Sequence, residues 1–338
     1  MTLDDTVAER RLEWLRLAAA RLRERVMAGL RMESAERLAE TAGVRGGDLV
    51  YRLDEHAGEA LLAVCEEWGR EEPFLLIAEG LEGGKRVFPA GAAPEKLAFT
   101  LIVDPVDGTR GLMYGKRSAW ALFGAAPAPR AGFWPGLADI TLALQAELPT
   151  PRAALADTLW AVAGGGAHGE TVDLRDGRVT RFTPRPSGAA GLAGGFASFA
   201  KFFPGARART AMIEEAFFRE VIGPPPENAP QVFDDQYISS GGQLYELMVG
   251  HDRFVADVRA LFAGRGLAAS LCAHPYDLCA ELIAREAGVA VRDPWGERLR
   301  APLDTETPIA WVGYASEALR AELEPALGRA LRAELGAG

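Results

Sequence analysis

Residues 101–109 constrain this chain more than any other segment. They read Leu-Ile-Val-Asp-Pro-Val-Asp-Gly-Thr, a strand of buried type that runs directly into two carboxylates three positions apart. Pro105 stiffens the turn and removes a backbone donor, so Asp104 and Asp107 can face one point instead of alternating across the strand. Two carboxylates fixed at a strand end are hard oxygen ligands that suit Mg²⁺. The segment therefore predicts a metal site.

Gly108 and Thr109 follow the carboxylates and supply backbone amides where the chain turns toward its next element. An anion binds readily at such a turn. The run Asp-Pro-Val-Asp-Gly-Thr at 104–109 resembles the central signature Asp-Pro-Ile/Leu-Asp-Gly/Ser-Thr of the metal-dependent sugar phosphatase superfamily. That superfamily comprises the inositol monophosphatases and their relatives, the fructose bisphosphatases and phosphoadenosine phosphatases.

Three further segments resemble the same family and occur in its order. An apolar run ends at Glu79, similar to the family's strand that delivers a metal-binding glutamate. Residues 274–280, His-Pro-Tyr-Asp-Leu-Cys-Ala, look like its Trp-Asp-x-Ala-Ala motif, and residues 48–54, Asp-Leu-Val-Tyr-Arg-Leu-Asp, resemble its Asp-Leu-Val-Thr-x-x-Asp run. The resemblance spans roughly residues 10–325, which is nearly the whole chain.

The resemblance implies a fold of the α+β class, a layered αβαβα sandwich. Residues 1–150 would form an N-terminal α+β part with the metal-binding motif, and residues 151–338 a C-terminal α/β part that closes the site. It also implies a homodimer.

The resemblance further implies a Mg²⁺-dependent phosphatase that uses two or three ions and activated water, without a covalent enzyme intermediate. Its substrate would be a phosphate monoester of a small polyol, sugar or nucleotide. Asp54 and Thr109 would be catalytic, with the Asp54 carboxylate as the partner of the threonine, and the amides of Gly108 and Thr109 would bind the phosphate. The metal ligands would be Glu79, Asp104, the carbonyl of Val106, Asp107 and Asp277.

Each of these acids has a plainer interpretation when it is taken alone. An acid after an apolar strand, such as Glu79, is commonly a cap or a turn former. Asp54 fits the start of a helix, and Asp277 could complement the dipole of a helix predicted over 275–287. Their combination with the intact central motif favours a metal site, because four converging carboxylates repel one another without metal.

The substrate side of the site is less determined. In inositol monophosphatases a glutamate seven residues before the last metal-binding aspartate contacts the sugar, and ungapped counting here falls on Ser270, which argues against inositol. The family's Gly-Thr-Ala segment, which touches sugar hydroxyls, resembles Ser239-Ser240-Gly241. Serines at a helix start are usually caps, but caps beside a bound ligand can serve both purposes.

Three basic residues, Arg110, Lys116 and Arg117, crowd just after the motif loop. They form either a solvated patch or a site for a second anionic group of the substrate. The second interpretation leaves open a phosphatase directed at bisphosphates, such as fructose bisphosphate or phosphoadenosine phosphate. From another class, the alternative is a regulatory protein that binds phosphorylated ligands without turnover. The four acids disfavour it, because a pure binder has no need for converging carboxylates that repel one another without metal.

Composition and charge limit the partners. The net charge of −10 argues against nonspecific nucleic-acid binding. The chain start lacks a basic and then apolar signal, and no apolar run approaches membrane-spanning length. We therefore expect a cytoplasmic protein whose partner is a small phosphorylated metabolite, with neither nucleic acid nor membrane.

One glycine-rich segment, residues 164–169, formally satisfies the dinucleotide-binding pattern GxGxxG. A dinucleotide site would need a helix next. Instead, two short alternating runs follow about an Asp-Gly turn, which predicts a hairpin. The other predicted helices cover about 5–31, 55–69, 206–221, 242–250 and 315–335, and the other predicted strands about 97–103, 118–124, 138–146, 158–163, 194–200 and 253–258.

Overall fold

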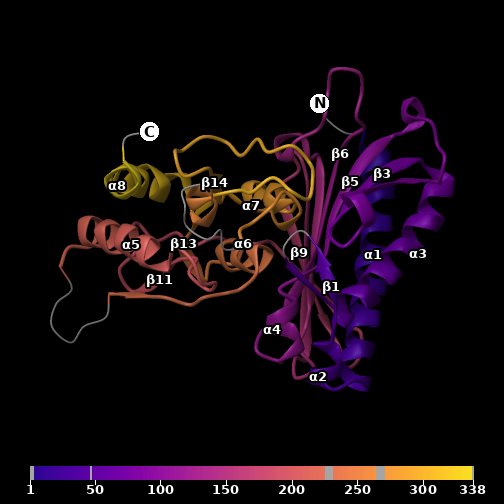
Figure 1. Ribbon diagram of the computed structural model, residues 1–338, viewed down its shortest axis with the longest axis horizontal. Coiled ribbons are helices and arrows are strands. Elements are labelled where there is room, and N and C mark those ends of the chain that lie inside the picture. Colours follow the sequence, from indigo (N-terminus) through magenta and orange to yellow (C-terminus); the bar gives the residue numbers. More distant parts are fainter. Residues whose placement is uncertain (1–3, 46–47, 225–230, 264–270, 337–338) are drawn as a thin grey trace.

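The computed structural model describes residues 4–45, 48–224, 231–263 and 271–336, with the backbone alone for residues 41–45 and 48–50. Its layers alternate between helices and sheets across the molecule (Figure 1). The order is outer helices, a large sheet, inner helices, a small sheet and a second set of outer helices. The predicted α+β layered sandwich is confirmed.

The large sheet has eight strands in the order β10-β9-β8-β7-β6-β5-β3-β4. Only β3 and β5 pair in parallel, so the carboxyl ends of these two strands meet at one edge of the sheet. The predicted division of the chain falls at residue 150, and the sheet continues past it. Its strands are β3 (Phe74–Ala78), β4 (Lys85–Phe88), β5 (Phe99–Asp107), β6 (Ala119–Pro127), β7 (Leu142–Leu148), β8 (Leu155–Val162), β9 (Ala167–Asp173) and β10 (Val179–Phe182).

Two long helices, α1 (Asp5–Met32) and α3 (Arg52–Glu71), cover the outer face of this sheet (Figure 1). Asp4 caps α1 by accepting a hydrogen bond from the amide of Thr6 at 3.1 Å. The apolar face of α1 includes Leu15 and Leu22, which are fully buried. Together with α3 and the sheet they form one hydrophobic core. Along the chain, α1 and α3 are separated by α2 (Ala35–Leu38) and by a hairpin of β1 (Thr41–Arg45) and β2 (Asp48–Tyr51).

The inner layer consists of α6 (Ser240–Met248) and α7 (Glu281–Ala287), between the two sheets (Figure 1). The helix predicted over 275–287 is wrong in its first part. The chain forms a separate 3-10 turn, η5 (Tyr276–Leu278), before α7 begins. The carboxylate of Asp277 accepts a hydrogen bond from the amide of His274 at 2.6 Å, so it closes this turn instead of continuing a helix.

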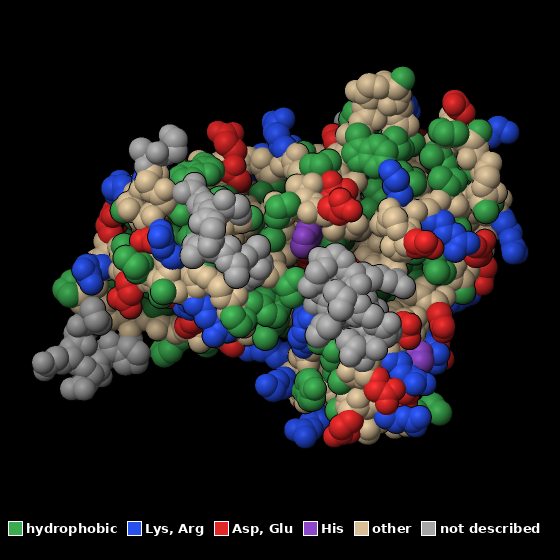
Figure 2. All heavy atoms as spheres, viewed as in Figure 1, with side chains coloured by type: hydrophobic (Ala, Val, Ile, Leu, Met, Phe, Trp, Pro, Cys, Tyr) green, Lys and Arg blue, Asp and Glu red, His purple; other side chains and the backbone are tan. Residues whose placement is uncertain are grey.

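The small sheet has the order β12-β11-β13-β15-β14, and α5 (Arg207–Val221) and α8 (Glu317–Leu335) cover its outer face. Its strands are β11 (Gly195–Phe199), β12 (Val232–Phe233), β13 (Asp252–Asp257), β14 (Ala290–Arg292) and β15 (Trp311–Tyr314). On the face shown in Figure 2, acidic and basic side chains are interspersed between apolar ones. Among the described residues, no helix has both the length and the apolar character that crossing a membrane requires.

Candidate active site

The strand β5 delivers two carboxylates to one point. All nine residues of β5 are buried, with Asp104 1% and Asp107 7% exposed. Residues three apart in a regular strand point to opposite faces. Here the pairing of β5 with β6 shifts register between Asp104 and Asp107, and Asp104 Oδ1 accepts the amide of Val106 at 3.0 Å. This irregularity lets both carboxylates face the same side.

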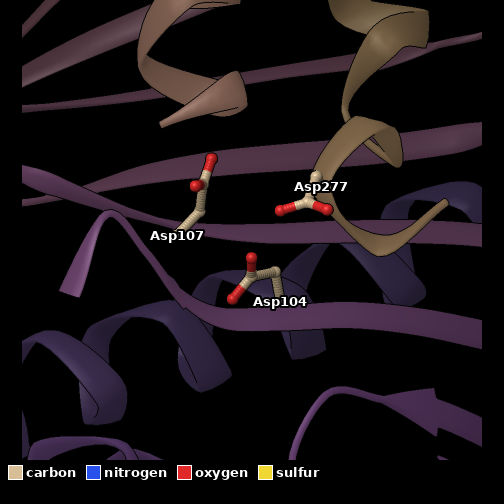
Figure 3. Close-up of side chains that lie close together, drawn as sticks. All are labelled: Asp104, Asp107 and Asp277. Atoms are coloured by element: carbon tan, nitrogen blue, oxygen red, sulfur yellow. The ribbon is translucent and has the colours of Figure 1, made fainter. Parts of the chain in front are cut away.

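The third carboxylate comes from a distant segment. Asp277, on η5, brings one oxygen within 4.8 Å of oxygens from both Asp104 and Asp107, and Figure 3 shows the three side chains converging from two segments of backbone. The turn of Asp277 packs closely on β6, because a Cβ on Gly124 would lie 2.9 Å from the carbonyl oxygen of Cys279. Glycine at position 124 therefore leaves room for the turn that carries Asp277.

The three aspartates are electrostatically unbalanced. Burial, followed by the charges of Glu79, Asp107 and Asp277, raises the pKa of Asp104 well above its ordinary value. Burial and the charge of Asp277 raise the pKa of Asp107 to about 8. Buried carboxylates in contact need either protons or a cation. Their oxygens are hard ligands, so this donor set fits a divalent cation such as Mg²⁺.

Glu79 lies beside the cluster and not within the 4.8 Å group. It directly follows β3, whose last residue, Ala78, pairs with Val103 of β5, so Glu79 comes next to Asp104. Its side chain is exposed. Among the neighbouring charges, that of Glu79 has the largest effect on the pKa of Asp104.

Thr109 and Asp54, 55 positions apart, are hydrogen-bonded. Thr109 Oγ1 donates to Asp54 Oδ1 at 2.7 Å and lies 2.9 Å from the carbonyl oxygen of Val106. The other oxygen of Asp54 accepts the amide of Tyr51 at 2.8 Å, at the start of α3. From the sequence, a cap and a partner of Thr109 were alternatives for Asp54. In the structure one carboxylate does both.

Gly108 begins the short helix α4 (Thr109–Met113) with a φ of 101°, a conformation that favours glycine. A Cβ at this position would also lie 3.1 Å from the Cβ of Ser239. The first amides of a helix have no intrahelical partner. The amides of Gly108 and Thr109 lie at this start of α4, directly after Asp107.

The segment Ser239-Ser240-Gly241 holds Asp107. Asp107 Oδ2 accepts the Ser239 hydroxyl at 2.9 Å and the Gly241 amide at 2.5 Å. Ser239 also caps α6 by accepting the amide of Gly242 at 2.8 Å. A Cβ on Gly241 would lie 2.6 Å from Leu122 and 3.0 Å from Asp107 Oδ2, so any other residue there would displace these side chains. Sequence reasoning linked this segment to substrate hydroxyls and missed its contact with Asp107.

The buried Gln145 was also missed from the sequence. Its amide nitrogen donates to the carbonyl oxygen of Gly241 at 2.7 Å and so supports the segment that holds Asp107. A glutamine inside the apolar run of β7 was the available signal. His274, whose ring lies 3.7 Å from the Asp277 carboxylate, is another neighbour of the site.

The three basic residues after the motif have different environments. Arg110 donates through Nε to the hydroxyl of Tyr51 at 3.1 Å. Arg117 forms an ion pair with Asp235. Lys116 is exposed, and its side chain makes no hydrogen bond or ion pair with the described part of the chain. Ser270, the position reached by counting back from Asp277, lies outside the described residues.

Solved structures share this fold. The Leishmania major fructose-1,6-bisphosphatase in its holo form aligns with a TM-score of 0.67 at 14% identity, over 94% of this chain and 93% of that chain. The extragenic suppressor protein SuhB from Bartonella henselae aligns with a TM-score of 0.63 at 16% identity, over 94% of this chain and 97% of that chain. The IMPase of Thermotoga maritima aligns with a TM-score of 0.58 at 16% identity, over 95% of this chain and 98% of that chain.

At these identities the likeness shows the fold, and that fold is the one the sequence resemblance implied. No protein-family model matches the chain, and no curated protein does.

Proposed function

We propose that this protein is a Mg²⁺-dependent phosphatase that hydrolyses a phosphate monoester of a small polyol, sugar or nucleotide. The observation that carries the proposal is the convergence of Asp104, Asp107 and Asp277 within 4.8 Å of one another. The hydrogen bond of Thr109 to Asp54 lies at the end of the same motif. The shared fold with a fructose-1,6-bisphosphatase and an IMPase supports it.

In this proposal Asp104, Asp107 and Asp277 hold divalent cations, with Glu79 and the carbonyl of Val106 completing the set. Two or three ions, when bound, would supply Lewis acidity at the phosphate and lower the pKa of the attacking water. The amides of Gly108 and Thr109 would bind phosphate oxygens at the start of α4. The hydrogen bonds from Ser239 and Gly241 fix the orientation of the Asp107 carboxylate.

The attacking water must also lose a proton. Of its two acceptors, the Thr109 hydroxyl lies nearer to the Asp54 carboxylate, at 2.7 Å, than to the Val106 carbonyl oxygen, at 2.9 Å. When it donates to Asp54, its lone pairs can accept a hydrogen bond from water. Asp54 is itself fixed by the amide of Tyr51. We propose that this pair orients the water. As the water attacks phosphorus, its proton passes to Thr109 Oγ1 and the threonine hydroxyl proton passes to the Asp54 carboxylate.

For the substrate we favour a monophosphate over a bisphosphate. Recognition of a second phosphate would need free cationic groups near the site, whereas Arg117 already pairs with Asp235 and lies 3.8 Å from Glu246. Arg110 is likewise engaged by Tyr51. Lys116 is the member of this group whose side chain is open to a ligand within the described part of the chain.

A phosphate-release screen over sugar, inositol and nucleotide phosphates, with Mg²⁺ or with EDTA, tests the proposal. We expect release from at least one monophosphate that requires Mg²⁺ and is absent from Asp104→Asn. Tight binding of a phosphorylated compound with no release at saturating Mg²⁺ would instead identify a non-catalytic binding protein. If Lys116→Ala raises KM, relative to the wild type, much more for a bisphosphate than for a monophosphate, the result would favour the bisphosphate alternative.

A further inference from the structure

Of the three converging aspartates, Asp277 is the one that β5 does not carry. Its position relative to Asp104 and Asp107 depends on how residues 271–277 are anchored to the rest of the fold. The carbonyl oxygen of Ala273 accepts the amide of Ile309 at 2.7 Å, and the His274 amide binds the Asp277 carboxylate. At the beginning of this arm, the carbonyl oxygen of Leu271 accepts a hydrogen bond from a side chain, that of Arg259.

Arg259 is held rigidly two residues after the end of β13. Its Nε donates to Asp257 Oδ1 at 2.7 Å and its Nη2 to Asp257 Oδ2 at 2.5 Å, a two-point pairing. Arg259 is 6% exposed and Asp257 is fully buried. The guanidinium also lies 4.3 Å from the ring centre of Phe202. Because Asp257 and Phe202 both contact the guanidinium, the Nη1 atom that donates to Leu271 has little freedom to move.

The ion pair and Asp277 share an electrostatic neighbourhood. The pKa of Cys272, the residue after Leu271, responds to the charges of Asp257, Arg259 and Asp277. Burial, and then the charge of Asp257, raises the pKa of the Cys272 thiol, Arg259 opposes the rise and Asp277 adds to it. The Asp257–Arg259 pair therefore lies close to the arm that carries Asp277, not in a remote part of the core.

We propose that Arg259 is a positioning residue for Asp277. By joining the end of β13 to the carbonyl of Leu271, its planar fork fixes the arm on which Asp277 approaches the other two aspartates. The inference rests on the proposed function, because it concerns the affinity of the same carboxylates for a divalent cation. Groups that orient a metal ligand typically change metal affinity by about tenfold to a hundredfold when they are replaced.

A purely structural ion pair would predict something different. Buried ion pairs add little net stability, but removal of one partner leaves an uncompensated charge and destabilises the whole fold. A structural role would thus lower stability without a specific change at the metal site. The two roles are separated by a substitution that keeps the charge and loses the fork, since lysine carries a point charge on a flexible stem.

The test compares Arg259→Lys with Arg253→Lys. Arg253 lies on β13, the strand that ends two residues before Arg259, and donates to the carbonyl oxygens of Gly191 and Ala193 at 2.9 and 2.7 Å, so it is a nearby control that does not contact the arm. Binding of Mn²⁺ is measured by electron paramagnetic resonance, and thermal unfolding is measured without metal. We expect Arg259→Lys to weaken Mn²⁺ binding about tenfold or more, with Arg253→Lys binding Mn²⁺ like the wild type.

Equal Mn²⁺ affinity in the two lysine variants would overturn the inference. If wild-type protein itself binds no Mn²⁺, the proposed function fails instead, so the two failures are distinguishable. Should Arg259→Lys not fold, the double variant Asp257→Leu with Arg259→Met removes both charges together and avoids a buried unpaired ion. It also removes the donor to Leu271, so it should fold and still bind Mn²⁺ about tenfold more weakly. Wild-type affinity in the double variant would likewise contradict the proposal.

Discussion

Two glycine-containing turns follow strands of the large sheet, and they differ in charge balance. After β5, the turn at Gly108 adjoins carboxylates that repel one another and have raised pKa values. After β8, the amides of Gly164 and Gly166 donate to the carboxylate of Glu286 from α7, at 2.9 and 3.0 Å. The second turn already holds an anion that belongs to the chain, whereas the carboxylates at the first turn need protons or a cation. Unbalanced charge, more than the glycine pattern, therefore distinguishes the turn of the proposed active site.

The largest expected effect contrasts these two turns directly. Asp104→Asn should lower turnover at saturating Mg²⁺ by about a thousandfold or more, because it removes a buried carboxylate of the proposed metal site. It should also raise the melting temperature of the metal-free protein, since it relieves carboxylate repulsion. Glu286→Gln is the control and should leave turnover unchanged. An Asp104→Asn variant with more than about a tenth of wild-type turnover would be too active for the role assigned here.

The next largest effect concerns Thr109 and Asp54. Thr109→Val keeps the shape and loses the hydroxyl, so kcat should fall about a hundredfold while metal affinity is retained. Thr109→Ser keeps the hydroxyl and should stay active. Asp54→Asn is a better probe than alanine, because an amide oxygen can still accept from Tyr51 and preserve the helix start.

A double variant of Thr109→Val and Asp54→Asn then tests their partnership. Since both single changes remove the same step, the double variant should be little slower than either one. Fully multiplicative losses in kcat would show that the two residues act separately.

A smaller effect is expected from pH. The folded-state pKa of Asp107 is about 8, above its ordinary value, so the folded protein binds more protons than the unfolded chain between about pH 4 and 8. Without metal, stability should fall as pH rises through this window, and Mg²⁺ should reverse the trend because it displaces the proton. Melting temperatures across this range, with Mg²⁺ and with EDTA, check it. A metal-free protein that becomes more stable toward pH 8 would contradict the assigned charge imbalance.

The smallest expected effect belongs to the second turn. Glu286→Ala leaves the amides of Gly164 and Gly166 without their carboxylate and should lower the free energy of unfolding by about 1 kcal/mol. Turnover and KM should not change. Denaturant unfolding measures the first quantity and a phosphate-release assay the other two. A large loss of turnover in this variant would mean that the two turns are coupled after all.

The sequence predicted much of the fold because its long amphipathic helices and apolar strands carry their own periodicity. The helices α1, α3 and α8 and the strand β5 lie close to their predicted ranges. Short elements were missed. The strands β4, β14 and β15 have three or four residues each, too few for an alternating pattern, and they exist because neighbouring strands pair with them. The turn η5 was merged with α7 because the local composition is helical throughout.

The site was predictable where neighbouring residues in sequence define it. Asp104, Asp107 and Thr109 lie in one short motif. The residues that hold them could not be predicted, because they come from elsewhere in the chain. The amide of Gly241, at the start of α6, donates to Asp107. Gly124, on β6, packs against Cys279 in the segment that carries Asp277. Arg259 had no motif at all, and its relation to Leu271 exists only in three dimensions.

Binding of Mn²⁺, followed by electron paramagnetic resonance, tests the central claim most directly, because it asks whether the three converging aspartates hold divalent cations. The account predicts that the wild type binds at least one ion per chain, that Asp104→Asn weakens this binding about a hundredfold or more, and that Glu286→Gln binds like the wild type. Wild-type protein that binds no Mn²⁺ at millimolar concentration, or an Asp104→Asn variant that binds it equally well, would contradict the account.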